Sequence, residues 1–195
     1  MTRRELINYS DSDPFCRLLC THLTARQILR LRQKNQYWLI TMVKVVVVYE
    51  SKYGNTKRVA EIIIEGIREV QEGETALNQV KDVDLDKIAE YDVILIGSPN
   101  HYGGPTKGIS EFIDKLEKLD LKGMHFAVFD THLGKGFFGK AARKMEKRIN
   151  EKVPGLKRIG PILSIAVQGS KGPIIEGELS KCKEFGKRIA TQFRT

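Results

Sequence analysis

Cysteine is scarce in this chain. Its three copies, Cys16, Cys20 and Cys182, are too few and too unevenly spaced for a disulfide framework, so we expect a reducing, cytoplasmic environment. Cys16 and Cys20 have only His22 nearby, which does not match zinc-ligand spacing. Cys182 falls at an apolar position of a helical pattern. We therefore expect no metal site and interpret the cysteines as structural or incidental.

Long apolar runs are also missing. The longest stretch, from about Trp38 to Tyr49, is interrupted by Lys44 and is too short to span a bilayer. The first residues lead to Asp11 and Asp13, where a secretory signal would have an apolar segment. The sequence therefore predicts neither membrane insertion nor a secretory signal.

Acidic residues are outnumbered, with 24 Asp and Glu against 33 Lys and Arg and a formal net charge of +9. Residues 1–41 hold seven Lys and Arg against three Asp and Glu, and they lack the strand-and-loop alternation that follows. We interpret them as a basic N-terminal extension. It is a disordered surface appendage, a partner-binding arm, or upstream sequence that the natural product lacks because translation starts at Met42. We favour the third interpretation, which intact-mass measurement of the native protein tests.

From Met42 onward, apolar strand-like runs alternate with helical patterns. The sequence predicts one α/β domain over residues 42–195, with a doubly wound parallel sheet of five strands and helices on both faces. The expected strands are 43–50, 76–80, 92–97, 125–130 and 161–167, of which the second has the weakest signal. The expected helices are 55–71, 107–119, 139–152 and 176–193, with a short helix from Asp84.

A short polar loop ends the first predicted strand. The β-branched run Val45–Tyr49 is followed by Ser51–Thr56 and then by a helix whose apolar residues recur every three or four positions. Backbone N–H groups at a helix N-terminus lack intrahelical acceptors, so such a loop is typical of phosphate sites. It matches neither G-x-x-x-x-G-K-[ST] nor G-x-G-x-x-G. The alternative is that Asn55 or Thr56 only caps the helix.

The loop after the third predicted strand carries small and planar residues. Gly97, Gly103 and Gly104 permit close backbone approach. His101 and Tyr102 offer planar faces to a ring system. In a doubly wound sheet, ligands bind at the carboxyl ends of the strands that flank the switch point, here the first and the third. An ordinary turn would also explain the glycines, but not why they follow that strand.

Together the two loops resemble those of the flavodoxin family. Ser51-Lys-Tyr-Gly-Asn-Thr56 resembles the S-x-Y-G-N-T phosphate loop of flavodoxin-like domains in quinone reductases and flavo-diiron proteins. Gly97-Ser-Pro-Asn-His-Tyr-Gly-Gly-Pro105 is similar to the family's G-S-P-T-x-x-G-G-P loop, with Asn100 where Thr is usual. The resemblance implies the flavodoxin-like strand order 2-1-3-4-5 and an FMN cofactor.

The resemblance also implies a role for each loop. The first would cradle the FMN phosphate, and the second would lie along the isoalloxazine ring, with a carbonyl beside Gly103 accepting a hydrogen bond from the reduced flavin. A looser match after the fourth strand would bond the pyrimidine side. It would place Phe137 or Phe138 as a stacking ring, unless these residues open a helix as part of the core. The expected FMN-binding residues are Ser51, Lys52, Tyr53, Gly54, Asn55, Thr56, Ser98, Pro99, Asn100, His101, Tyr102, Gly103, Thr131, His132, Gly134 and Phe137.

Asp130, at the end of the fourth predicted strand, raises the alternative of a phospho-receiver domain. Receivers need an acidic pair after the first strand and a phosphorylatable aspartate after the third. This chain has Glu50-Ser-Lys and Gly97-Ser-Pro at those places, which excludes the receiver interpretation.

The function that the resemblance implies is electron transfer by an FMN protein, which requires no catalytic residue. Two alternatives stay open: an NAD(P)H-dependent quinone or FMN reductase on the same fold, and a flavin-free interaction module. A basic cluster after the third loop would suit an acidic, ferredoxin-like redox protein, or NAD(P)H together with a quinone. No nucleic-acid-binding motif accompanies the charge, so we expect no nucleic-acid partner. The cluster comprises Lys135, Lys140, Arg143, Lys144, Lys147 and Arg148.

Overall fold

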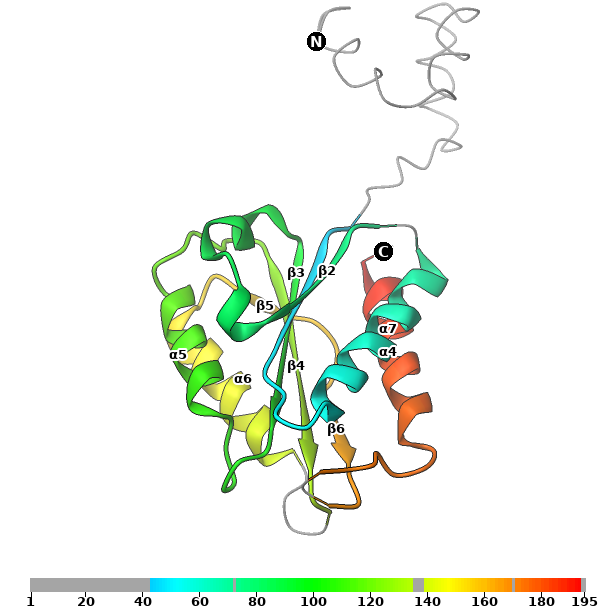
Figure 1. Ribbon diagram of the computed structural model, residues 1–195. Coiled ribbons are helices and arrows are strands. Elements are labelled where there is room, and N and C mark those ends of the chain that lie inside the picture. Colours follow the sequence, from blue (N-terminus) through cyan, green and yellow to red (C-terminus); the bar gives the residue numbers. More distant parts are fainter. Residues whose placement is uncertain (1–42, 72, 135–138, 170, 194–195) are drawn as a thin grey trace, which may run out of the picture. The chain divides into compact units, whose positions relative to one another are not determined.

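Apolar strands and amphipathic helices alternate along the chain and stack in three layers (Figure 1). The computed structural model describes residues 43–71, 73–134, 139–169 and 171–193, so the predicted extension lies outside the described residues. Within these ranges the strands are β1 (Val45–Tyr49), β2 (Thr75–Gln79), β3 (Val93–Pro99), β4 (His125–His132), β5 (Lys157–Arg158) and β6 (Leu163–Ala166). The helices are α4 (Asn55–Val70), α5 (Lys107–Leu116), α6 (Lys140–Lys152) and α7 (Glu178–Gln192), with 3₁₀ helices η1 (Val80–Asp82) and η2 (Leu85–Glu90).

The strands form one parallel sheet in the order β2-β1-β3-β4-β5, and β6 also pairs with β4. This arrangement confirms the predicted doubly wound fold. Strand β1 is buried along its whole length because helices cover both faces of the sheet. Strand β2 is only half-buried, since it lies at the edge.

The fifth strand is divided in two, which the sequence analysis did not predict. The expected strand 161–167 corresponds to β6, which pairs with the carboxyl half of β4, while β5 pairs with the start of β4. The ladder is interrupted where Gly160 adopts a φ of +70° and is followed by Pro161. A proline has no N–H to donate, and a left-handed residue turns the chain out of the strand direction.

Two helical layers cover the sheet, with α4 and α7 on one face and α5 and α6 on the other (Figure 1). Val45 and Val47 belong to the apolar cluster beneath α4 and α7, whereas Val46 and Val48 belong to the opposite cluster. Cys182 packs in the first cluster, where burial raises the pKa of its thiol to about 12. Among the described residues, no helix has the length and apolarity that crossing a membrane requires.

Helices α4 and α7 approach each other closely at two glycines. A Cβ atom added to Gly66 would lie 2.2 Å from the carbonyl oxygen of Lys183, and one added to Gly186 would lie 2.1 Å from that of Ile63. Glycine in a helix interior costs about 1 kcal/mol relative to alanine. The two glycines therefore stand where the backbones of the helices leave no room for a side chain.

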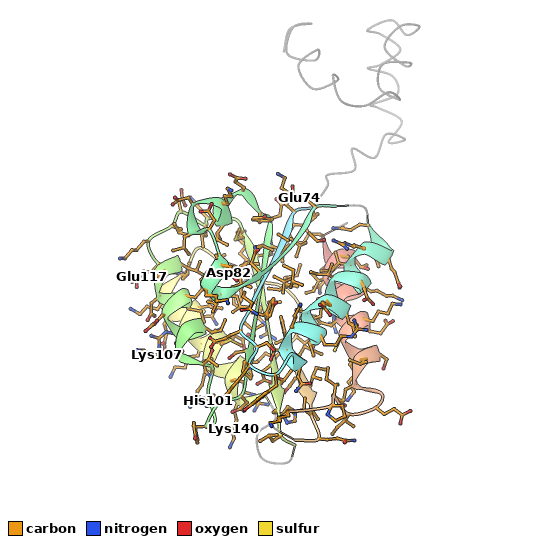
Figure 2. All side chains as sticks on the ribbon, in the orientation of Figure 1. Glu74, Asp82, His101, Lys107, Glu117 and Lys140 are labelled. Atoms are coloured by element: carbon orange, nitrogen blue, oxygen red, sulfur yellow. The ribbon has the colours of Figure 1, made fainter. Side chains whose placement is uncertain are left out.

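The carboxyl ends of the strands lie at one edge of the sheet. Figure 2 shows His101 and Lys140 toward that edge and Glu74 at the opposite one. Each crossover helix returns antiparallel to its strands, so the N-termini of α4, α5, α6 and α7 lie at the same edge as the strand ends. The positive ends of the helix dipoles and the loops that follow the strands therefore lie at the same edge of the sheet.

Candidate functional site

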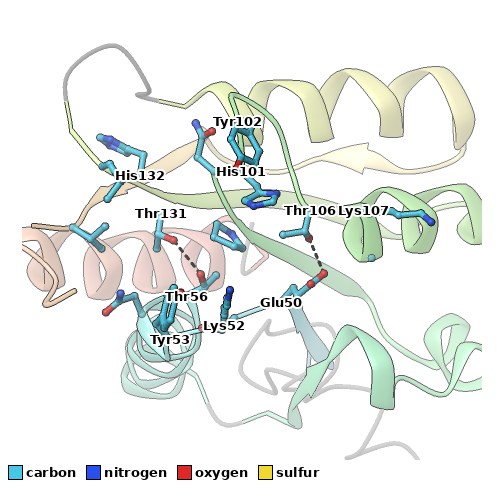
Figure 3. Close-up of a pocket in the computed structure, with 17 residues that line it drawn as sticks. Glu50, Lys52, Tyr53, Thr56, His101, Tyr102, Thr106, Lys107, Thr131 and His132 are labelled. Atoms are coloured by element: carbon cyan, nitrogen blue, oxygen red, sulfur yellow. Dashed lines mark hydrogen bonds between the residues drawn. The ribbon is translucent and has the colours of Figure 1, made fainter. Parts of the chain in front are cut away.

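A cavity of about 760 Å³ opens at the carboxyl ends of β1, β3 and β4 (Figure 3). Its lining comes from residues 50–56, 99–108 and 131–133, with Val167 from the end of β6. This volume lies in the range of small-molecule and cofactor sites. The topology therefore brings together the loops that the sequence analysis selected.

The loop after β1 builds the N-terminus of α4. Gly54 has a φ of +89° and precedes the helix, and its N–H donates to the Ser51 hydroxyl at 3.1 Å. Among the residues that the structure describes, no side chain caps α4. Gly54 occupies the N-cap position and Asn55 begins the helix, so the alternative that Asn55 or Thr56 caps it is wrong.

Thr56 links the phosphate-type loop to β4. Its side chain is 1% exposed, and its hydroxyl lies 3.0 Å from the hydroxyl of Thr131 (Figure 3). A hydroxyl donates one hydrogen bond and accepts others, so this pair can still turn one O–H toward an anion. The two buried threonines fix the distance between the first and third loops of the cavity.

A tight turn carries the exposed aromatic residue of the second loop. His101 N–H donates to Gly104 C=O at 2.7 Å, and Gly104 N–H donates back at 3.1 Å. Both central residues are left-handed, Tyr102 at φ +51° and Gly103 at φ +81°, as in a type I′ turn. The Asn100 side chain reinforces the turn by accepting the Gly103 N–H at 2.9 Å.

Tyr102 has a strained backbone conformation and an exposed side chain. A non-glycine residue in this backbone region is uncommon, and such strain clusters at functional sites. Its side chain is nevertheless 94% exposed, so the core gains nothing from it. The His101 and Tyr102 rings meet edge to face with centroids 4.6 Å apart, and both lie at the cavity. The combination indicates that the ring is held there for contact with a ligand or a partner.

A family model described as flavodoxin matches residues 47–176. The chain belongs to the flavodoxin family. A flavodoxin from Clostridium beijerinckii is 33% identical over 146 residues, covering 74% of this chain and 97% of that protein. The solved structure of a flavodoxin from the domain Archaea superposes with a TM-score of 0.67 at 27% identity, covering 78% of this chain and all of that one (100%). An NAD(P)H dehydrogenase (quinone) from Geotalea daltonii is 24% identical over 196 residues, covering 76% of this chain and 95% of that protein.

This flavodoxin-family chain is thus an FMN-binding electron-transfer protein. The cavity fits that cofactor in its donor chemistry. The free N-terminal turn of α4 and the buried hydroxyl of Thr56 suit a phosphate. The rings of Tyr53, His101 and Tyr102 suit a flat conjugated ring system.

The structure brings most of the predicted site residues to the cavity wall. Gly54, Ser98, Gly103 and Gly134 do not line it, and Phe137 lies outside the described residues. Contact of each residue with FMN stays a prediction. The predicted residues that line the cavity are Ser51, Lys52, Tyr53, Asn55, Thr56, Pro99, Asn100, His101, Tyr102, Thr131 and His132.

Ser98 has a supporting place behind the cavity. It is fully buried and accepts the N–H of Thr106 at 3.0 Å, and the Thr106 hydroxyl donates to the Glu50 carboxylate at 2.7 Å (Figure 3). Sequence reasoning missed Glu50 and Thr106 as lining residues. Their positions, directly after β1 and directly before α5, were the available signal.

The segment after β6 also reaches the phosphate-type loop. Residues 168–178 resemble the K-G-P-x-x-E-G-E segment of microbial flavodoxin-like proteins, and the sequence assigned them no chemistry. In the structure, a Cβ added to Gly172 would lie 2.5 Å from the Asn55 side-chain oxygen. The turn therefore packs directly against Asn55, and Val167 adds an apolar side chain to the wall.

Lysines lie in the lining of the cavity and beside the turn next to it. Lys52 and Lys107 line it from the β1 and β3 loops. On the other side, the aliphatic chains of Lys140 and Lys144 lie 4.0 and 3.4 Å from where Cβ atoms on Gly103 and Gly104 would stand. Among the described lining residues, Glu50 is the one carboxylate. The site therefore has a positive electrostatic environment.

Asp130 is a buried carboxylate directly behind the cavity. It accepts the N–H of Ala142 at 3.0 Å and the hydroxyl of Ser164, and that hydroxyl in turn accepts the N–H of Gly139 at 2.8 Å. Burial raises the pKa of Asp130 above its ordinary value, against the hydrogen bonds that lower it. The carboxyl thus ties the N-terminus of α6 to β4 and β6.

Replacing Asp130 with asparagine should change how stability depends on pH. Because the native pKa of Asp130 is raised, the folded state binds more protons than the unfolded chain above about pH 4. Stability of the parent therefore falls as the pH rises through that native pKa, and Asp130→Asn should remove this decline. Thermal unfolding midpoints measured from about pH 4 to about pH 8 check it, and parallel curves would contradict it.

Asp114→Asn is the matched control, with the opposite sign. Hydrogen bonds from Arg148, at 2.7 Å for Nε to Oδ1, hold the pKa of Asp114 below its ordinary value. Its stabilising contribution is present above the unfolded pKa and is lost as the pH falls through the lowered native pKa. The control variant should therefore be less stable than the parent at neutral pH, and the difference should shrink in acid.

Proposed function

We propose that the cavity holds FMN, with the phosphate in residues 51–56 and the ring between residues 98–103 and residues 131–134. The protein then works as a cytoplasmic electron carrier for an acidic redox protein. One observation carries the proposal: the cavity joins a helix N-terminus to a strained, exposed aromatic turn, and lysines lie in its lining and beside that turn.

FMN supplies the redox chemistry, taking up one or two electrons, and the side chains bind and orient it. The N–H groups at the start of α4 and the Thr56 hydroxyl neutralise the phosphate, which fixes the cofactor at one end. The Asn100 amide holds the Tyr102–Gly103 turn closed, so the ring end of the cavity keeps its shape. No side chain has to transfer a proton for electrons to pass.

The domain assignment belongs to the same proposal. Residues 42–195 form the FMN-binding domain, and residues 1–41 are an extension that the FMN site does not need. The family match begins at residue 47 and supports this boundary.

The lysines favour an acidic partner. Lys140 and Lys144 flank the turn that displays Tyr102, so a partner that covers the turn meets both positive charge and an aromatic ring. Complementary charge steers encounter and is screened by salt. We therefore expect the rate of electron transfer from the reduced protein to an acidic ferredoxin to fall severalfold between low and high ionic strength. Stopped-flow absorbance measures this rate, and a rate that stays constant or rises with salt would argue against an acidic partner.

A second candidate is NAD(P)H-dependent quinone reduction. The Geotalea daltonii relative carries that name and aligns over nearly its whole length. Tyr53, Tyr102 and Leu133 are exposed at the cavity, which leaves apolar surface for a second planar substrate. This candidate needs the same FMN site but also a direct reaction with NADPH.

Absorption spectroscopy tests these proposals together. The full chain is reconstituted with FMN and titrated with dithionite, and separately with NADPH. Reduction by dithionite in two resolved one-electron stages, without a response to NADPH, supports the carrier. Rapid bleaching by NADPH supports the reductase, and failure to bind FMN removes the site assignment and favours a flavin-free module.

A further inference from the structure

The positive charge along α6 is uneven. Toward the C-terminus, Lys147, Arg148 and Lys152 pair with Glu151, Asp114 and Glu117 at 3.7, 2.5 and 3.2 Å. Toward the N-terminus, Lys144 has no acidic partner among the described residues, and it lies beside the Tyr102–Gly103 turn with Lys140. Among the described residues, Lys144 therefore keeps a charge without an acidic partner beside this turn, whereas Lys147, Arg148 and Lys152 are paired.

The opposite side of the cavity adds charge of the same sign. Lys52 lines the cavity with its ammonium 5.3 Å from the Tyr53 ring centroid, whereas Lys107, which also lines the cavity, pairs with Glu111 at 3.4 Å. The N-termini of α4, α5 and α6 point their positive dipole ends to this edge. Glu50 contributes the opposite charge, and its carboxylate already accepts a hydrogen bond from the Thr106 hydroxyl.

The charge of a flavin ring changes on reduction. Two electrons and one proton added to the neutral ring leave one negative charge on it, because the second proton is not taken up at neutral pH. A positive environment stabilises this anion and does little for the neutral oxidised ring. Binding and reduction are linked, so any preference for reduced FMN raises the midpoint potential of the bound cofactor.

We propose that the lysines around this cavity make the protein bind reduced FMN more tightly than oxidised FMN, so that it accepts electrons from weaker reductants than free FMN does. The inference rests on the proposed FMN site. The midpoint potential of the bound FMN would then be higher than that of free FMN. Milder reductants than those needed for free FMN could serve as its electron donors.

The test compares the dissociation constants of the two FMN states with the full chain. Oxidised FMN is titrated by fluorescence in air, and reduced FMN is titrated anaerobically in excess dithionite. We expect reduced FMN to bind at least about tenfold tighter, which corresponds to about 30 mV for a two-electron couple. Raising the salt concentration should shrink the ratio.

Charge-neutral variants identify the source of the preference. The double variant Lys52→Gln, Lys144→Gln should bring the affinity ratio down about tenfold, with the midpoint potential about 30 mV lower. Lys147→Gln, on the same helix but paired with Glu151, is the control and should leave the ratio unchanged. Circular dichroism verifies that each variant is folded.

The outcomes separate this inference from the proposed function. FMN binding without preference for the reduced state, or a double variant that keeps the parent ratio, would overturn the inference and leave the FMN site standing. Failure of either FMN state to bind would overturn both.

Discussion

Alanine at position 186 should lower the free energy of unfolding by about 2–4 kcal/mol. Gly186 lies in the middle of α7, where alanine alone would favour the helix by about 1 kcal/mol. The new Cβ would stand 2.1 Å from the carbonyl oxygen of Ile63, so α7 has to move away from α4. Backbone cannot rotate aside as a side chain can, and the shift disturbs the apolar cluster along both helices.

Urea unfolding followed by circular dichroism measures this loss. Arg188→Ala is the control, because it places alanine two residues further along α7 at an exposed position. It should change the free energy of unfolding by no more than about 0.5 kcal/mol. Equal stability of Gly186→Ala and the parent would show that the two helices are not in backbone contact.

Loss of the Thr56 hydroxyl should weaken FMN binding by about 1–3 kcal/mol, a roughly 5- to 150-fold higher Kd. The hydroxyl is buried at the N-terminus of α4, where water cannot replace it as a partner of the phosphate. In Thr56→Ala the Thr131 hydroxyl also loses its partner at 3.0 Å. Fluorescence titration of FMN measures the effect.

Two further variants separate binding from folding. Thr56→Ser keeps a hydroxyl at the same position and should restore most of the affinity. Thr191→Ala removes an exposed threonine hydroxyl that bonds the Lys187 carbonyl on α7, far along the chain from the phosphate-type loop, and should leave the Kd unchanged. An unchanged Kd for Thr56→Ala would remove this residue from the FMN site.

The fold could be predicted because its signals are local. The run Val45–Tyr49 has no charged residue, so a strand covered on both faces was expected, and the polar loop after it had to begin a helix. The switch-point rule then selects the loop around His101 from the sequence alone. Both loops line one cavity.

The remaining features depend on contacts between distant residues. Nothing near Ser98 reveals that its hydroxyl accepts the Thr106 N–H while Thr106 binds Glu50. The division of the fifth strand depends on how Gly160 and Pro161 fit against β4, which periodicity does not show. Such features depend on tertiary packing, which the pattern of residues along the sequence does not reveal.

The contact between Gly172 and Asn55 has a consequence for protein engineering. The cofactor loop occupies a few consecutive residues and looks like a cassette that could be grafted onto another parallel sheet. A recipient with any larger residue opposite Asn55 would push the amide aside, because even one methyl group would lie 2.5 Å from its oxygen. A graft of residues 50–56 therefore has to bring the turn around Gly172 with it, and the transferable unit is two segments more than a hundred residues apart.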